Sequence, residues 1–121
     1  MKIYGLVLLM ILAHTVWAAD DKGNYAIWGA GAKSCQGYNV ARAANEDAKF
    51  KDYLMGYLTS YNHMTEKTYS ISSQMSLDEV MTWIDEQCEL KPMISFEEVL
   101  TNFLAEHYEK RMKYPAGGGF Q

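Results

Sequence analysis

The sequence predicts an all-α fold, a compact four-helix domain clasped by one disulfide. Apolar residues recur with the spacing of a helix in several stretches, and no stretch alternates in the way that a strand requires. Two serine-based helix-start motifs, at Ser76 and Ser95, divide the second half of the chain into two helices. The chain has only two cysteines, Cys35 and Cys88, so a single bridge would clasp the helices.

Residues 1–18 have the pattern of a secretory signal peptide. A short positive start precedes an apolar run over 3–12, and Val16 and Ala18 supply the small residues of a cleavage site. A membrane-spanning helix would need about 20 apolar residues, and polar residues interrupt this run too early. We therefore expect cleavage after Ala18 and a periplasmic or secreted protein, in a compartment where two thiols usually pair.

A bridge between Cys35 and Cys88 would close a loop of about 53 residues, worth roughly 4 kcal/mol on the chain-entropy model. A domain of this size is stable by about 5–10 kcal/mol in total. Metal binding, the other use of paired cysteines, needs more ligands than the chain offers in a recognisable spacing. We therefore expect a structural disulfide and no metal.

The domain organisation follows from removing the signal. The remaining 103 residues suffice for one small domain and not two. We expect a lead-in over 19–33, the helical domain over 34–113 and a flexible Gly-rich tail over 114–121. The mature chain carries ten Lys and Arg against fifteen Asp and Glu, with no basic run. This balance argues against nucleic acid and against an anionic membrane surface as partners.

The first two helices are predicted from a cap and a periodic face. Ser34 is a good N-cap for a short helix from Cys35 to about Ala43, and Asn45 can cap a longer one. One face of the longer helix repeats apolar and aromatic residues over three turns. The members of that face are Phe50, Tyr53, Leu54, Tyr57, Leu58 and Tyr61.

The last two helices have the clearest local signals. Ser76 with Glu79, and Ser95 with Glu98, each have the form of a capping box. The helix that starts after Ser76 must stop before Pro92, because proline disfavours helical backbone in the residue before it. The second is expected to run to about Met112.

The side chains offer little support for an enzyme, and we expect neither catalytic residues nor a cofactor. The mature chain has two histidines, of which His107 falls on an apolar helix face and His63 near a helix end. Two pairs of adjacent carboxylates occur, but neighbours on a helix point in different directions, so they are interpreted as helix-start charge and solvated surface. The pairs are Asp85–Glu86 and Glu97–Glu98.

Tyr53, Tyr57 and Tyr61, spaced by four, have two interpretations. They form a core whose hydroxyls reach the surface, or a protein-binding face, because aromatic residues are enriched in interfaces. Gly56 inside this helix costs about 1 kcal/mol relative to alanine, so a close helix approach is expected there.

The two tryptophans of the mature chain receive different interpretations. Trp28, just ahead of Cys35, is expected to cover the disulfide. Trp83 falls off the main apolar face of its helix, where an exposed tryptophan would be a candidate partner contact.

Several of these features together resemble a known group of small exported proteins. Trp28 ahead of Cys35, Tyr38 three residues on, a Gly56–Tyr57 helix, and Cys88 followed by Pro92 resemble the HdeA/HdeB periplasmic acid-stress chaperones. The pattern is also similar to immunity proteins of type VI secretion. The resemblance implies a compact four-helix HdeA-like domain around the bridge, with Cys35 and Cys88 at its disulfide positions and Trp28 at the preceding tryptophan.

Two modes of protein binding follow as expectations. In acid the carboxylates lose their charge, leaving a net charge near +12, and self-repulsion would loosen the fold or a homodimer so that apolar surface meets unfolding clients. The alternative is an immunity or inhibitor protein that binds one periplasmic toxin or enzyme through its native surface. A purely structural interaction module is a third interpretation. In each case the partners are other proteins, with no membrane contact after signal cleavage.

Overall fold

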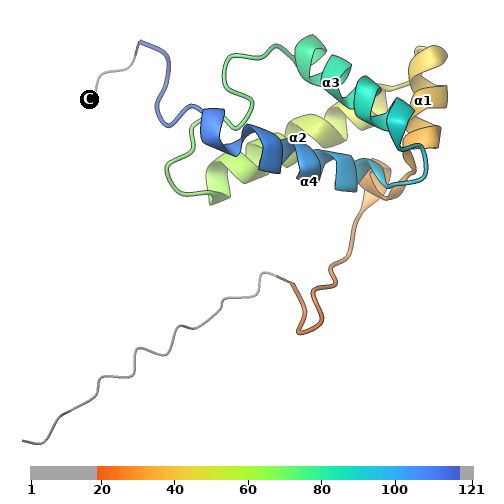
Figure 1. Ribbon diagram of the computed structural model, residues 1–121, viewed down its shortest axis with the longest axis horizontal. Coiled ribbons are helices and arrows are strands. Elements are labelled where there is room, and N and C mark those ends of the chain that lie inside the picture. The colour runs from red at the N-terminus through yellow and green to blue at the C-terminus, as the bar shows by residue number, and fades with distance from the viewer. Residues whose placement is uncertain (1–18, 118–121) are drawn as a thin grey trace, which may run out of the picture.

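Four α-helices form the body of the protein in a computed structural model that describes residues 19–117 (Figure 1). The described residues contain no β-strand, only two isolated bridges. The all-α prediction with one disulfide is therefore confirmed. The predicted signal peptide over 1–18, and residues 118–121 of the predicted tail, lie outside the described residues. The helices run over Cys35–Ala43 (α1), Ala48–Met64 (α2), Leu77–Leu90 (α3) and Phe96–His107 (α4), with short 3-10 turns at Gly29–Ala32 (η1) and Tyr108–Lys110 (η2).

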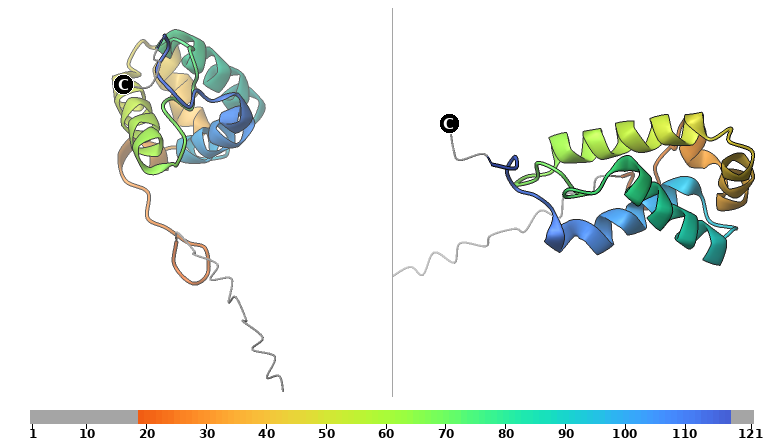
Figure 2. Two further views of the ribbon diagram at one scale, coloured as in Figure 1. Left: turned by 90° about the vertical axis from the view of Figure 1, so that its left-hand side faces the viewer. Right: turned by 90° about the horizontal axis from the view of Figure 1, so that it is seen from above.

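The helices enclose one apolar core. The longest helix, α2, and the last, α4, lie on opposite sides of it, α3 covers the top, and the short α1 closes one end (Figures 1 and 2). An aromatic cluster at the centre joins α1, α2 and α4: the rings of Tyr38, Phe50 and Phe96 lie 5.0–5.3 Å apart, centroid to centroid. Among the described helices, none is long and apolar enough to cross a membrane.

The disulfide joins Cys35, the first residue of α1, to Cys88 in the last turn of α3. Both cysteines are fully buried, and they belong to the same core cluster as the aromatic rings. The predicted pairing is confirmed. The bridge fixes the end of the molecule where α1 crosses α3.

Local capping chemistry sets most of the helix starts. The Ser34 hydroxyl accepts a hydrogen bond from the backbone N–H of Gly37 at 3.1 Å. At Ser76 both halves of the predicted capping box with Glu79 are present. At Ser95 only one half forms among the described residues, the bond from the Glu98 N–H to the serine hydroxyl.

The start of α2 differs from the prediction. Asn45 does not cap this helix, which begins at Ala48 after Asp47. Asn45 instead takes a left-handed conformation, with φ of 55°, and ends α1. The N–H of Glu46 bonds back to the carbonyl of Ala41, and that of Asn45 to Arg42, the two bonds of a Schellman motif. Asparagine tolerates this backbone better than most residues, which explains its place at the turn.

The last helix is shorter than predicted. It ends at His107 rather than near Met112, because the chain passes through η2 and then pairs with the loop between α2 and α3. The N–H of Met112 bonds the carbonyl of Ser70, and the Met112 carbonyl accepts from the N–H groups of Ser70 and Tyr69. Figure 1 shows these two segments together at the end of the molecule opposite α1. A long-range pairing therefore overrides the helical periodicity of this segment.

Candidate functional site

Two clusters of polar side chains lie between the helices, and each is built around carboxylates. The first, which we call the Glu97 cluster, consists of Tyr25, Tyr57, Glu97 and Thr101. The second, the Arg42 clasp, consists of Tyr38, Arg42, Asp47 and Asp85.

The tyrosines of α2 lead into the Glu97 cluster. Tyr53 lies over buried Gly31 of η1, where even a methyl group would overlap its ring. The Tyr57 ring stacks on that of Tyr53 with centroids 6.0 Å apart. These two tyrosines therefore fill the space between α2, α4 and η1, and only Tyr57 directs its hydroxyl at a carboxylate.

Glu97 is a buried residue, 6% exposed, and its carboxylate receives hydrogen bonds from hydroxyl groups in three parts of the chain. Tyr25, in the segment before η1, donates to it at 3.0 Å, and Tyr57 of α2 donates at 3.2 Å. Thr101, one turn further along α4, donates at 3.1 Å. The ion pairs within residues 19–117 join Arg42 and Lys51 to Asp47 and Asp85, and none involves Glu97. A nearly buried carboxylate is thus held by neutral donors alone.

The Glu97 carboxylate helps to raise the pKa values of the two tyrosines that donate to it. The hydrogen bond to Glu97 is the main cause that raises the pKa of Tyr25 above its usual value of about 10. Burial raises the pKa of Tyr57 to about 12, and the charge of Glu97 adds to the shift. Both tyrosines consequently stay protonated, and act as donors, throughout the physiological pH range.

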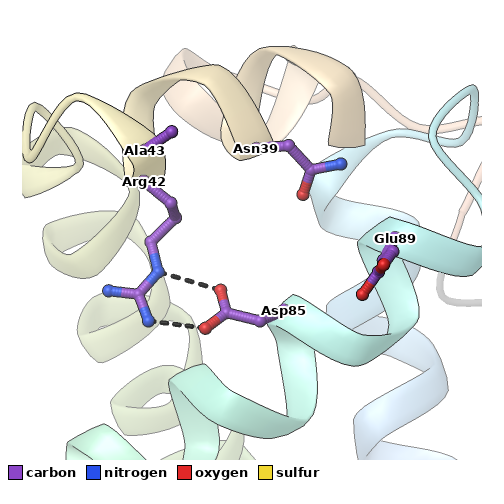
Figure 3. A pocket seen from close by; sticks show the side chains of 5 residues that line it. All are labelled: Asn39, Arg42, Ala43, Asp85 and Glu89. Atoms are coloured by element: carbon purple, nitrogen blue, oxygen red, sulfur yellow. Dashed lines mark hydrogen bonds and ion pairs between the residues drawn. The ribbon is translucent and has the colours of Figure 1, made fainter.

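The Arg42 clasp ties three helices together near the disulfide. Figure 3 shows the guanidinium of Arg42, on α1, reaching across to the carboxylate of Asp85 on α3. Two parallel bonds form there, Nε to Oδ1 at 2.8 Å and Nη2 to Oδ2 at 2.6 Å, the bidentate geometry that favours arginine over lysine. Arg42 also donates to Asp47, the N-cap residue of α2, at 3.0 Å, and the buried Tyr38 donates to Asp85 at 2.6 Å.

Both aspartates of the clasp hold their charge more strongly than an exposed aspartate does. Burial alone would raise the pKa of Asp85, but the hydrogen bonds from Arg42 and Tyr38 outweigh it, so the pKa lies below its usual value. Burial opposes the charge of Asp47 in the same way, and bonds from Arg42 and its own backbone lower its pKa. The intact clasp therefore depends on two ionised carboxylates.

A shallow hollow of about 600 Å³ lies beside the clasp, lined by Asn39, Arg42, Ala43, Asp85 and Glu89 (Figure 3). Asn39 uses its side-chain amide to donate to the carbonyl of Cys88, so it supports the end of α3. The described residues contain no group of three or more His, Cys, Asp or Glu side chains that could hold a metal ion.

The structure contradicts the predicted role of Trp28 as a cover for the disulfide and the exposure expected of Trp83. Trp28 is 83% exposed, whereas the disulfide is fully buried without it. The extended backbone of Trp28 precedes η1, which packs on α2 and α4, whereas the bridge joins α1 to α3. Trp83 is half-buried rather than exposed, because its ring packs edge-on against Phe103 and His107. His107 stacks on Phe103 at 3.9 Å, which agrees with its predicted place on an apolar face.

The third predicted tyrosine and the glycine on the same helix take no part in the hydrogen bonds of the Glu97 cluster. Tyr61 is half-buried beside Met64 and Leu104, in a hollow of about 240 Å³ between α2 and α4. Gly56 has open space around its Cα and no helix approaches it, so the expected close approach is wrong and nothing in the structure explains the glycine.

Sequence reasoning missed the carboxylates at the centre of both clusters. The sequence predicts helix-start charge and solvated surface at Glu97 and Asp85, yet Glu97 is buried and Asp85 is half-buried. Their neighbours Glu98 and Glu86 are exposed, as predicted. Helical spacing places Glu97 on the same side as Leu100 and Thr101, a weak signal that could have marked it as inward-facing.

Comparisons of the chain with protein-family models, with characterised proteins and with solved structures find no match. The function therefore has to be inferred from the two clusters and the surface around them.

Proposed function

We propose that this protein is an exported, non-catalytic protein-binding domain that acts as an acid-stress chaperone of the periplasm, in the manner of the HdeA-like proteins it resembles. The observation that carries the proposal is the Arg42 clasp. It joins α1 to both α2 and α3 through two carboxylates, and those carboxylates are the groups that acid neutralises.

The direction of the pH effect follows from the lowered pKa values of Asp47 and Asp85. A carboxylate whose pKa is lower in the folded state stabilises the fold fully above the unfolded value, about pH 4. This stabilisation is lost as the pH falls through the lower, folded value. The clasp is therefore intact at neutral pH and open in strong acid.

The disulfide determines which surface becomes exposed when the Arg42 clasp opens. It keeps the start of α1 attached to the end of α3 when the clasp no longer holds. The net charge near +12 in acid then separates the remaining elements, and the apolar faces of α2 and α4 meet solvent. The exposed core residues would be Phe50, Leu54, Phe96 and Phe103, which are buried at neutral pH.

The predicted signal sequence and the buried disulfide support a place in the periplasm, where acid reaches proteins directly and thiols are oxidised. In that compartment an acid-opened apolar surface would bind unfolding proteins. A homodimer that dissociates in acid would work in the same way, and its mass would reveal it.

The test is a titration of the oxidised mature protein, residues 19–121, from neutral pH to about pH 2. An apolar dye, the molecular mass and the protection of an acid-denatured client from aggregation are followed together. We expect dye binding and client protection to appear at the same pH. A protein that remains dye-silent, or that opens without protecting the client, would refute the chaperone proposal.

One pair of variants links the effect to the clasp. Asp85→Asn mimics the protonated aspartate with little change of shape, so dye binding is expected to begin at a higher pH than in the wild type. Glu86→Gln removes the same charge from the next residue of α3, where the side chain is exposed, and is the matched control. Equal shifts in the two variants would mean that net charge, and not the clasp, sets the response.

A second function, an immunity or inhibitor protein for one periplasmic toxin or enzyme, is favoured by the exposure of Trp28. At 83% exposure this tryptophan offers a large apolar contact on the native surface. An inhibitor would act at neutral pH, with one-to-one stoichiometry, and Trp28→Ala would weaken it strongly. Client protection by the chaperone, which appears only in acid, does not use the native surface and would be unaffected by that substitution.

A further inference from the structure

A second hollow, which we call the Lys33–Lys49 hollow, lies where η1 meets the starts of α1 and α2. It encloses about 500 Å³, within the range of roughly 300–1,000 Å³ that is typical of small-molecule sites. It shares no residue with the Glu97 cluster or the Arg42 clasp. Its lining consists of Gly29, Ala30, Lys33, Gly37, Lys49 and Phe50.

The hollow exists because its walls carry few side chains. Gly29 has a φ of +67°, a backbone that strongly favours glycine, and nothing lies within 4 Å of a Cβ built on it. Gly37 lies in the first turn of α1, and the nearest atom to an added Cβ there would be the Ser34 hydroxyl oxygen, 3.7 Å away. The remaining lining residues are Ala30, Phe50 and the two lysines, whose side chains have long apolar stems.

The two lysines are the only charged residues in this lining. Both are exposed, and within the described part of the chain neither side chain makes an ion pair or a hydrogen bond. Lys51, in contrast, pairs with Asp47. The start of α1 adds no free donor, because the N–H groups of Cys35 and Gln36 already bond to carbonyls of the loop before α4. An anion in the hollow would therefore be recognised by the lysines.

We propose that the Lys33–Lys49 hollow binds a small anionic amphiphile, a monocarboxylate with an apolar tail. The carboxylate would lie between the two ammonium groups, and the tail would cover Ala30 and Phe50. A small, purely polar anion would leave the apolar floor in contact with water. A cationic amphiphile would face two like charges. The inference goes beyond the chaperone proposal and does not depend on it.

The test uses the oxidised mature protein at neutral pH and decanoate as the probe. Calorimetry measures affinity and stoichiometry, and amide chemical shifts of Gly29 and Gly37 locate the site. We expect saturable one-to-one binding of decanoate, with shifts at both glycines, and much weaker binding of decyltrimethylammonium. Absence of saturable binding, or equal binding of the cationic amphiphile, would overturn the proposal.

Variants separate the site from general charge effects. Lys33→Gln and Lys49→Gln are each expected to weaken decanoate binding by about tenfold, the loss of one charge-assisted contact. Gly37→Leu fills the hollow and is expected to abolish binding without unfolding the protein, since leucine favours a helix more than glycine does. Lys91→Gln, an exposed lysine outside the lining, is the matched control and is expected to bind normally. Equal losses in Lys91→Gln and Lys33→Gln, or full binding by Gly37→Leu, would overturn the proposal.

Discussion

The Arg42 clasp and the Glu97 cluster both hold carboxylates between helices, but they give them different partners. In the clasp, one guanidinium forms ion pairs with two aspartates, so the interaction needs both the positive charge of the arginine and the negative charges of the aspartates. In the Glu97 cluster, hydroxyl groups are the donors, and no cation of the described residues pairs with the carboxylate. A protonated carboxyl still exchanges hydrogen bonds with hydroxyls, whereas a protonated aspartate leaves its arginine without a counter-charge. The partner, and not the carboxylate itself, decides which region acid can open.

The two regions also differ at high pH. The raised pKa values of Tyr25 and Tyr57 mean that the Glu97 cluster contributes its full stability below about pH 10. That stability is lost as the pH rises through the folded values, about 12 for Tyr57. The clasp should therefore weaken first in acid and the Glu97 cluster first in alkali. The following substitutions test this contrast.

The largest effect is expected from removing the disulfide, which joins the same two helices as the clasp. Cys35→Ser/Cys88→Ser should lose about 4 kcal/mol of unfolding free energy at neutral pH, from the entropy of the opened loop. The clasp would then be the main polar link between α1 and α3, so the midpoint of acid unfolding should rise. Urea unfolding followed by circular dichroism at several pH values measures both changes. An unchanged acid midpoint would mean that the clasp contributes little.

Arg42→Met should lower the free energy of unfolding by about 2 kcal/mol at neutral pH. The loss is smaller than for a fully buried ion pair, because Arg42 and Asp85 are partly exposed. The difference from the wild type should shrink as the pH falls through the lowered pKa values of the two aspartates, because the clasp opens as they become protonated. Lys91→Met, at an exposed site, serves as the control for loss of a cation. A cost that persists undiminished in acid would show that Arg42 acts through packing rather than charge.

Glu97→Gln should lower the free energy of unfolding by about 1 kcal/mol at neutral pH, because the amide oxygen still accepts hydrogen bonds from the tyrosines but carries no charge. Tyrosine absorbance in alkali gives a sharper result. The pKa of Tyr25 should return toward 10, because the bond to Glu97 is the main cause of its rise. The pKa of Tyr57 should stay clearly raised, because burial is the main cause there. If both tyrosines kept their wild-type pKa values, Glu97 would not be the centre of the cluster.

The smallest effect is expected for Tyr25→Phe, about 0.5 kcal/mol, since Tyr25 is largely exposed. The loss should be local, with faster hydrogen exchange in residues 20–28, because this hydroxyl connects that segment to α4. Tyr69→Phe is the matched control, an exposed tyrosine whose hydroxyl makes no hydrogen bond in the described residues. Equal effects of the two substitutions would remove Tyr25 from the cluster.

The candidate site was far less predictable than the helices around it. The spacing of Tyr53 and Tyr57 marks both as candidates, and the structure turns both toward the interior beside η1 and α4. The partner that organises them, Glu97, looked like ordinary helix-start charge. Tyr25 lies 72 residues away from Glu97 in the chain, so no local pattern could connect the two. Asp85 and Arg42, 43 residues apart, were missed for the same reason.

By itself, the sequence determined the features that depend on a few neighbouring residues. The starts of α1, α3 and α4 follow from serine caps, the end of α3 from Pro92, and the disulfide from the presence of only two cysteines. Tertiary structure decided the rest: the early end of α4 where Met112 pairs with Ser70, the exposure of Trp28 and the burial of Glu97. Capping and periodicity act within one or two turns of helix, whereas burial and ion pairing depend on which distant segments the core brings together.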